Sequence, residues 1–281
     1  MVRGYLMAPQ NLIGFSKDDL FSQNIFKKFF EKISGLGYTM SSSKYTPSIS
    51  GIPQNNMDEK NSILIVFGGD GTMLRALKHH KSIPTIGINC GSFGFLSEFE
   101  ASNLDDAIAF IQKAEWIEEQ VNMIESSLED TSYLGVNECV ISGADTGRPV
   151  DLRVMVDGIT MYESRGDGLI INSPIGSTAY NIASGGAIIS PNIHALSITP
   201  IAPFLTLDRS VIVDSNKVIE ILNLERTRSC KVFYDGIFQH ELLPGQQFTL
   251  KSANEYSIFL RRPGSFSRRM ALKIANRYPI R

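Results

Sequence analysis

The sequence predicts a chain of two parts, an α/β part with a doubly wound parallel sheet followed by an all-β part of packed sheets. Between residues 1 and 120, short apolar runs alternate with amphipathic helical patterns, as in a sheet covered by helices. From about residue 121 to 260, short alternating runs are separated by turn signals, which is typical of an antiparallel β domain. The 281 residues suffice for two modest domains, 1–120 and 121–260, with segment 261–281 expected to complete the first.

The first part is predicted element by element from its periodicity. An amphipathic helix is expected over 19–33, with an apolar face that includes Phe26 and Phe29. The stretch 35–59 is rich in Ser, Pro, Gly and Asn, and we expect a loop there. The remaining elements of this part are expected to be a strand over 63–67, a helix to about residue 80, a strand over 83–89 and a helix over 103–116.

The second part is predicted as a series of short strands. Asp157-Gly158 and Asp235-Gly236 stand between such runs and indicate hairpin turns. A weakly amphipathic basic helix is expected over 266–278, packed on the first domain. The runs taken as strands are 152–156, 159–162, 168–172, 210–213, 218–222, 231–234, 247–250 and 257–260.

The composition is that of an ordinary globular protein and argues against several function classes. A formal net charge of −2 speaks against a general nucleic-acid or membrane surface. The three cysteines lie far apart and the four histidines form no metal-ligand spacing, so we expect a reducing compartment and no structural zinc. No apolar run approaches the roughly 18 residues of a membrane span, and the N-terminus lacks a signal-peptide core. We therefore expect a cytoplasmic protein.

The motif around which the first part is organised is Gly68-Gly69-Asp70-Gly71-Thr72, between a buried strand and a helical pattern. A helix N-terminus offers unpaired N–H groups and a positive dipole end, and glycines let a phosphate approach the backbone. Thr72 is a candidate helix cap. Asp70 is either a general base for a hydroxyl that attacks phosphorus or a group that acts through Mg²⁺. The alternative is a tight turn without a ligand.

A second glycine-rich turn, Cys90-Gly-Ser-Phe-Gly-Phe-Leu96, follows the strand over 83–89. Two parallel strands that end in such turns predict a shared ligand edge. A plain loop is equally compatible with these residues.

Two further polar stretches lie in the second part. Gly166-Asp-Gly168 leads through a strand into Ser173-Pro-Ile-Gly-Ser-Thr-Ala-Tyr-Asn181, whose hydroxyls, amides and Tyr180 ring suit adenine and ribose. A capped helix start explains the same residues. Upstream, Asn137 and Glu138 interrupt an apolar run, either as a turn or as ligands for sugar hydroxyls.

Together these stretches resemble NAD kinases of the bacterial type. The Gly-Gly-Asp-Gly-Thr turn alone also resembles lipid kinases and phosphofructokinases, but the three motifs in this order, over about residues 60–240, are specific. The resemblance implies a Rossmann-like N-terminal domain, a β-sandwich C-terminal domain and an active site between them. It implies transfer of the ATP γ-phosphoryl group to the 2′-hydroxyl of the NAD adenosine ribose, giving NADP, with Mg²⁺ or another divalent cation on the donor phosphates. A homo-oligomer, a dimer or tetramer, is also implied, with some substrate contacts that cross between subunits.

The resemblance also assigns roles to residues. Asp70 would be the base and Asp167 would meet the nicotinamide end of NAD. Basic substrate contacts would come from Arg75, Arg148 and Arg165. The donor phosphates would lie at Gly71, and Gly68, Gly69 and Thr72 are expected among the binding residues. The adenosine part would lie at Asn137, Glu138, Thr178, Ala179, Tyr180, Asn181, Ile182 and Ala183.

One departure and two alternatives remain. After Asp235-Gly236 the family leads us to expect a polar residue such as Gln, but Ile237 stands there, so the role of Asp235 is open. A lipid kinase would share the first turn but leaves Thr178-Ala179-Tyr180 unexplained. A non-catalytic nucleotide sensor would bind both ligands without turnover.

Overall fold

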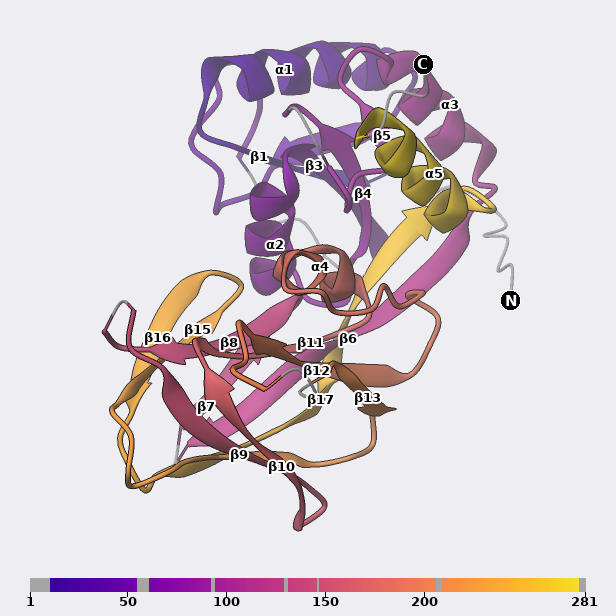
Figure 1. Ribbon diagram of the computed structural model, residues 1–281. Coiled ribbons are helices and arrows are strands. Elements are labelled where there is room, and N and C mark those ends of the chain that lie inside the picture. The colour runs from indigo at the N-terminus through magenta and orange to yellow at the C-terminus, as the bar shows by residue number, and fades with distance from the viewer. Residues whose placement is uncertain are drawn as a thin grey trace. The chain divides into compact units, whose positions relative to one another are not determined.

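The computed structural model describes residues 11–54, 61–91, 94–128, 131–145, 147–205 and 209–277. The chain divides into two compact units, which are coloured along the sequence in Figure 1. Unit 1 comprises Met1–Gln120 and Ser257–Arg281, and unit 2 comprises Val121–Tyr256. Two long strands, β6 (Ile117–Leu128) and β17 (Gln247–Arg261), contribute residues to both units.

Unit 1 is built on a parallel sheet with the order β2-β1-β3-β4-β17, in which only the end of β17 takes part and β5 pairs with β4. All of these pairs are parallel, so the carboxyl ends of β1, β3 and β4 share one edge. The strands are β1 (Asn11–Ser16), β2 (Thr39–Ser42), β3 (Ser62–Gly68), β4 (Pro84–Asn89) and β5 (Phe99–Glu100). The helices are α1 (Leu20–Ser34), α2 (Asp70–His79), α3 (Leu104–Lys113) and α5 (Ser265–Arg277).

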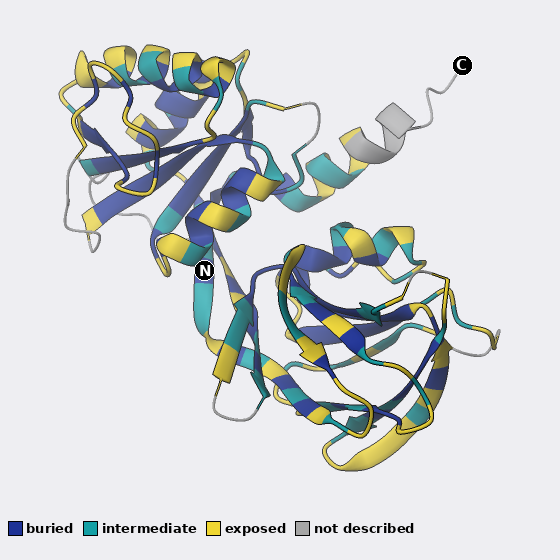
Figure 2. Cartoon of the chain, turned by 90° about the vertical axis from the view of Figure 1, so that its left-hand side faces the viewer, coloured by how far each residue is buried: buried dark blue, intermediate teal, exposed yellow. Residues whose placement is uncertain are grey.

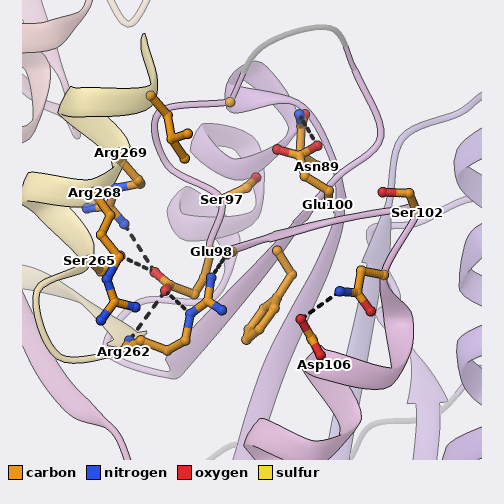
Figure 3. A pocket seen from close by; sticks show the side chains of 14 residues that line it. Asn89, Ser97, Glu98, Glu100, Ser102, Asp106, Arg262, Ser265, Arg268 and Arg269 are labelled. Atoms are coloured by element: carbon orange, nitrogen blue, oxygen red, sulfur yellow. Dashed lines mark hydrogen bonds and ion pairs between the residues drawn. The ribbon is translucent and has the colours of Figure 1, made fainter. Parts of the chain in front are cut away.

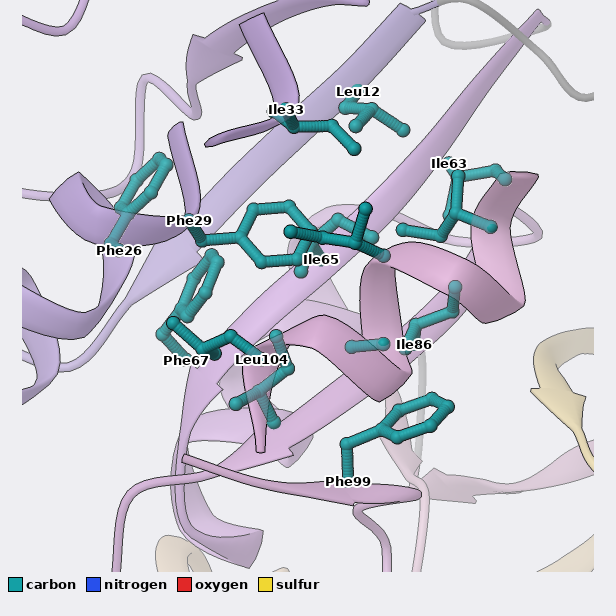
Figure 4. Packing of buried hydrophobic residues seen from close by; sticks show 14 of the residues in the cluster. Leu12, Phe26, Phe29, Ile33, Ile63, Ile65, Phe67, Ile86, Phe99 and Leu104 are labelled. Carbon is teal, nitrogen blue, oxygen red and sulfur yellow. The ribbon is translucent and has the colours of Figure 1, made fainter. Parts of the chain in front are cut away.

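The larger core of unit 1 lies where α1 and α3 cover the sheet. Phe26 and Phe29 of α1 pack on Phe67 of β3, with 4.7 Å between the ring centroids of Phe26 and Phe67 (Figure 4). Helix α2 buries Met73, Ala76 and Leu77 and contacts β3 without joining this cluster. Helices thus lie on both faces of the sheet, as predicted for a doubly wound fold.

Unit 2 is a β-sandwich. One sheet has the order β10-β9-β14-β17, and the other has the order β13-β12-β11-β8-β15-β16. Residues of both sheets form a single apolar core, and Figure 2 shows buried positions mixed with intermediate and exposed ones along these strands. The further elements are β7 (Thr131–Gly135), β8 (Glu138–Gly143), β9 (Val150–Val156), β10 (Ile159–Gly166), β11 (Gly168–Asn172), η2 (Ile175–Thr178), α4 (Tyr180–Ala183), β12 (Ala195–Ile201), β13 (Val211–Asp214), β14 (Ile219–Asn223), β15 (Cys230–Tyr234) and β16 (Ile237–Leu242).

The predicted fold class is confirmed, and so are both hairpin turns. The φ angles are 50° at Asp157 and 76° at Gly158. They are 48° at Asp235 and 78° at Gly236, and a tight two-residue hairpin turn requires such positive values. Within 35–59, where a loop was expected, the structure has strand β2, which pairs with β1. This strand was missed because its Thr-Met-Ser-Ser sequence lacks an apolar signal. The runs 247–250 and 257–260 belong to one 15-residue strand, whose polar middle interrupts the pattern without ending the strand.

Three other expectations are adjusted by the structure. Helix α2 begins at Asp70 with Gly69 as its cap, so Thr72 is not a cap. Besides β2, the strands that were not predicted are β1, β5, β6, β7, β8, β12 and β16. Positions 55–60, Ser92, Phe93 and residue 278 of the predicted segments lie outside the described residues. Within the part of the chain described here, no helix has the length and apolar character of a membrane span.

Candidate functional site

The first candidate site begins where β3 ends at Gly68 and α2 starts at Asp70. The carbonyl of Gly69 accepts hydrogen bonds from the N–H groups of Thr72 and Met73, at 3.0 and 3.1 Å. The first N–H groups of a helix have no intrahelical acceptor, and the dipole makes this end positive. The strand and helix therefore place Asp70 and Gly71 at an end that suits an anion.

The Asp70 carboxylate is held by the second glycine-rich turn. Its two oxygens accept the N–H of Phe95 at 2.8 Å and the N–H of Leu96 at 3.0 Å. The Cys90 N–H also donates to the Gly68 carbonyl at 3.3 Å. The two turns thus meet at one sheet edge, because β3 and β4 are parallel neighbours. Asp70 remains half-exposed, and each carboxylate oxygen retains a lone pair for another donor.

The three glycines of this turn have different reasons for lacking a side chain. A Cβ at Gly68 would lie 2.5 Å from the Thr72 hydroxyl, so packing inside the chain explains that glycine. A Cβ at Gly69 or Gly71 would meet no atom within 4 Å, and neither residue has positive φ. A glycine costs about 1 kcal/mol in a helix relative to alanine. No contact among the described residues explains why Gly71 lacks a side chain. This supports the close approach of an external ligand to its backbone.

A cavity of about 410 Å³ opens beside these glycines. Lys17 and Arg75 supply positive charge to it. Sequence reasoning missed Lys17, because β1, which ends just before it at the same sheet edge, was not predicted. Burial raises the pKa of the Cys90 thiol to about 11, so this side chain adds no negative charge at neutral pH. The cavity is lined by Lys17, Ser22, Gly69, Gly71, Thr72, Arg75, Cys90 and Gly91.

The second candidate site, in unit 2, is the turn that precedes β8. Asp235 lies in the β15–β16 hairpin, and its carboxylate accepts N–H bonds from Val136 at 2.9 Å, Asn137 at 2.7 Å and Glu138 at 3.2 Å. This explains Asp235 without a substrate contact, whatever residue stands at position 237. The carboxylate fixes the backbone from which Asn137 and Glu138 project.

Asn137 and Glu138 are both 7% exposed. Asn137 Oδ1 and Glu138 Oε2 are buried and have no hydrogen-bond partner among the described residues. Burial, and secondarily the Asp235 carboxylate, raise the pKa of Glu138 to about 8. Buried polar atoms are rarely unpaired, and an exception calls for an explanation such as a ligand.

The predicted stretch 173–183 packs directly against this turn. The Ser173 hydroxyl donates to the Val136 carbonyl at 2.7 Å, and a Cβ at Gly176 would lie 2.1 Å from the Asn137 carbonyl. Tyr180 is 45% exposed, and Thr178, Ala179, Ile182 and Ala183 are also partly or fully exposed. Asn181 differs from them because it is buried and its amide is bonded to Ser177, Ala187 and Thr199. Its contacts support the loop structure.

The remaining predicted residues form a separate group at the other end of β8 and β11. Glu138 pairs with Asn172, and Ser142 pairs with Gly168, so four residues of strand separate the two ends. At about 3.4 Å per residue, this is roughly 14 Å. Asp167 is exposed beside Gly143, whose N–H donates to the Asp167 carbonyl. Arg148 and Arg165 are also exposed, and Arg165 lies 5.7 Å from the centroid of the Phe204 ring.

Comparison with known proteins gives a consistent result. Residues 31–115 match the family described as ATP-NAD kinase N-terminal domain, and residues 136–261 match the ATP-NAD kinase C-terminal domain. An NAD kinase of Carboxydothermus hydrogenoformans is 30% identical over 277 residues, which is 94% of this chain and 99% of that relative.

Two solved structures share the fold. A yeast NADH kinase complexed with NADH has a TM-score of 0.79 at 19% identity, with 95% of this chain and 88% of that chain covered. An Archaeoglobus fulgidus NAD kinase in complex with ATP has a TM-score of 0.75 at 23% identity, with 93% and 97% covered.

Proposed function

The chain belongs to the NAD kinase family, and from this premise we propose that it transfers the γ-phosphoryl group of ATP to the 2′-hydroxyl of the NAD adenosine ribose, with Asp70 as general base. The observation that carries this proposal is the placement of Asp70. Its carboxylate is fixed by two backbone N–H groups, and its two neighbours in the chain, Gly69 and Gly71, line a cationic cavity. The arrangement combines an anion site with a proton acceptor, which phosphoryl transfer to a hydroxyl requires.

The donor phosphates are proposed to occupy the cavity beside Gly69 and Gly71. Lys17 and Arg75 supply charge complementarity, and the N-terminus of α2 adds N–H donors. These groups offset the repulsion between the phosphates and Asp70.

Asp70 is proposed to take the proton of the attacking hydroxyl. As O2′ forms a bond to the γ-phosphorus, the bond from that phosphorus to the β–γ bridging oxygen breaks and ADP leaves. The hydroxyl proton passes to a carboxylate oxygen of Asp70, and NADP is formed. The fixed orientation of the carboxylate supports this role, because general-base catalysis depends first on geometry.

The residues of unit 2 are proposed to hold NAD. The unpaired oxygens of Asn137 and Glu138, with Thr178, Ala179, Tyr180, Ile182 and Ala183 nearby, suit the hydroxyls and ring of the adenosine part. The group of Arg148, Arg165 and Asp167 suits the nicotinamide end and the pyrophosphate. A separation of roughly 14 Å along the strands fits a dinucleotide, whose two ends are recognised separately.

Mg²⁺ or another divalent cation is proposed to accompany the donor phosphates. In the described part of the chain, no cluster of three His, Cys, Asp or Glu side chains is present, so an all-protein cage is not the expected mode. Mg²⁺ commonly binds through one or two carboxylates together with substrate phosphates. The cation would be held mainly by the donor phosphates beside Gly69 and Gly71 and would neutralise their charge, which leaves the Asp70 carboxylate to act as the base.

We further propose a cytoplasmic homo-oligomer, a dimer or tetramer. All three cysteines are free thiols, which is compatible with a reducing compartment. Phe204 and Leu205 of unit 2 are 66% and 62% exposed, and adjacent exposed apolar side chains of this kind favour a protein interface.

The decisive experiment is an acceptor and donor survey with the purified protein. ATP, Mg²⁺ and NAD should yield NADP, detected with an NADP-specific coupled dehydrogenase. Polyphosphate in place of ATP and NADH in place of NAD then define the preferences. Incubation with diacylglycerol or a sphingoid base should give no phosphorylated lipid.

Two results would contradict the proposal. Phosphorylation of a lipid without NADP formation would favour the lipid kinase. Saturable binding of ATP and NAD without any product would instead indicate a nucleotide sensor. A reaction without ATP is the matched blank.

A further inference from the structure

The position of the Asp70 carboxylate depends on a short segment of loop, residues 94–98 between β4 and β5. Both oxygens of the Asp70 carboxylate accept hydrogen bonds from backbone N–H groups of this segment, those of Phe95 and Leu96. A displacement of the segment would carry the carboxylate with it or break these bonds. Whatever fixes the segment therefore also fixes the proposed base.

Arg261, the last residue of β17, binds this segment directly. Its guanidinium Nη1 donates to the Leu96 carbonyl at 2.8 Å, and the same Leu96 donates its N–H to Asp70. One residue thus joins the guanidinium to the carboxylate through two hydrogen bonds.

Arg261 is itself rigidly placed. It is 3% exposed, its Nε donates to Glu119 at 3.2 Å, and its guanidinium lies 4.5 Å from the centroid of the Phe259 ring. Such a buried guanidinium is expensive to desolvate, and a buried ion pair is weak evidence of a stabilising role. A role in positioning explains why the charge is kept there.

Further contacts, made by other side chains, hold the same segment at Glu98, which also pairs with Arg261 at 3.6 Å. The Glu98 carboxylate accepts from Arg262 Nε at 2.9 Å, from the Ser265 hydroxyl at 2.5 Å and from Arg269 at 3.3 Å, and Figure 3 shows these side chains converging on it. These contacts retain the course of the chain when Arg261 is replaced. Loss of Arg261 should therefore shift the Leu96 peptide without unfolding unit 1.

Ion pairs reinforce this cluster. Three guanidinium groups, those of Arg261, Arg262 and Arg269, face the carboxylates of Glu98 and Glu119. Burial, and then the Arg261 guanidinium, lower the pKa of Arg269 to about 10, whereas Glu119, Glu98 and, least, Asp70 act in the opposite sense.

From these contacts we propose that Arg261 is a positioning residue for Asp70. It orients the Asp70 carboxylate through the backbone of Leu96, whose carbonyl accepts from Arg261 and whose N–H donates to Asp70. The inference rests on the proposed role of Asp70 as base. An error of about 1 Å in the placement of a reacting group can cost roughly 100-fold in rate. We therefore expect Arg261→Met to lower kcat roughly 10- to 100-fold and to change the KM values for ATP and NAD by less than about threefold.

The test is a double-mutant cycle of Arg261→Met and Asp70→Asn. If Arg261 acts through Asp70, its replacement lowers kcat in the wild-type background and has little further effect in the Asp70→Asn background. Arg261→Lys, which keeps a positive charge and a nitrogen that donates hydrogen bonds, should restore part of the rate. Arg268→Met, an exposed arginine in the same terminal segment, is the matched control and should leave kcat unchanged.

The outcomes separate the two levels of inference. Unchanged turnover in Asp70→Asn overturns the proposed base and the positioning role with it. A strong loss in Asp70→Asn with normal kcat in Arg261→Met overturns the positioning role alone. Equal losses on Arg261→Met in both backgrounds also overturn it, because they indicate a general structural effect. If Arg261→Met does not fold, Arg261→Lys carries the same cycle.

Discussion

The two candidate sites each depend on an aspartate that collects backbone N–H groups from a neighbouring loop, yet the aspartates differ in what they leave exposed. In unit 1, Asp70 is held by Phe95 and Leu96 and remains half-exposed beside the cavity. In unit 2, Asp235 is bonded to the turn at 136–138, and the unpaired oxygens belong to Asn137 and Glu138.

In the proposed function, this difference separates a reacting group, Asp70, from a supporting group, Asp235. The loop in unit 1 orients the carboxylate, so the carboxylate itself is available for chemistry. The carboxylate in unit 2 orients the loop, so the loop side chains are available to a ligand. The comparison predicts a loss of turnover from changes at Asp70 and a loss of substrate binding from changes at Asp235.

The largest effect is expected for Asp70→Asn. An amide is a poor proton acceptor, and its NH₂ group would oppose one of the two backbone N–H donors. Turnover should fall about 10²- to 10⁴-fold, the usual scale for a lost general base. NAD binding, measured by calorimetry, should change by less than about threefold, because the proposed adenosine contacts lie in unit 2.

Asp105→Asn is the matched control, since Asp105 also lies in the first turn of a helix and its ion pair with Lys32 is exposed. It should leave turnover intact. Near-normal turnover in Asp70→Asn would remove Asp70 from the chemistry and reduce the turn to a structural feature.

The sequence predicted the parts of the first site that are local in the chain. The order of strand, glycines and helix determines where Gly69, Asp70 and Gly71 lie, because a strand and the helix after it are adjacent. Lys17 and Arg261 could not be found in this way. Their positions depend on β1 and on the end of β17, which enter the same sheet from distant parts of the sequence.

In unit 2, the sequence identified Asn137 and Glu138, which are proposed to face a ligand, but not the residue that supports them. Asp235 was recognised as a turn residue whose role toward the substrate was left open. Its supporting role was not foreseen, because its bonds to 136–138 cross about a hundred positions of the chain. Asn181 is the opposite case, a residue that the sequence pattern assigned to a ligand and that the fold uses internally. It stands in a ligand-like motif, but the fold directs its amide into the protein, toward Thr199 and Ala187.

An intermediate effect is expected for Asp235→Asn. Asparagine tolerates the positive φ of this turn, so the backbone should not be strained. The change weakens charge-assisted hydrogen bonds, which are worth about 1.5–3 kcal/mol each. The turn carrying Asn137 and Glu138 should loosen, and KM for NAD should rise about 10- to 100-fold while kcat changes less.

Asp157→Asn provides a closely matched control. Asp157 occupies the same position of the β9–β10 hairpin, with φ of 50°, and its carboxylate binds exposed Lys217 and the Val218 N–H. Steady-state kinetics of the two variants should differ only in KM for NAD. A fall in kcat with unchanged KM in Asp235→Asn would contradict the supporting role.

The smallest effect on activity at neutral pH is expected for Glu138→Gln, because the raised pKa of about 8 keeps Glu138 largely protonated there. The effect should instead appear in stability against pH. Between about pH 4.5 and 8, the unfolded chain loses this proton while the folded protein retains it. Stability therefore falls as pH rises across this interval, by a few kcal/mol in total, and the loss is complete above pH 8.

Glutamine carries no such titration, so Glu138→Gln should be more stable than the wild type at pH 8.5 and should lose this advantage toward pH 4.5. Thermal unfolding across the pH range measures the difference. Glu163→Gln is a control for which the expected change in stability has the opposite sign. Arg153 and Arg226 lower the pKa of Glu163, so replacing this residue should reduce stability above about pH 4.5. Parallel pH profiles for Glu138→Gln and the wild type would mean that Glu138 is ionised when buried. The protonated state of the buried Glu138 carboxyl would then be incorrect.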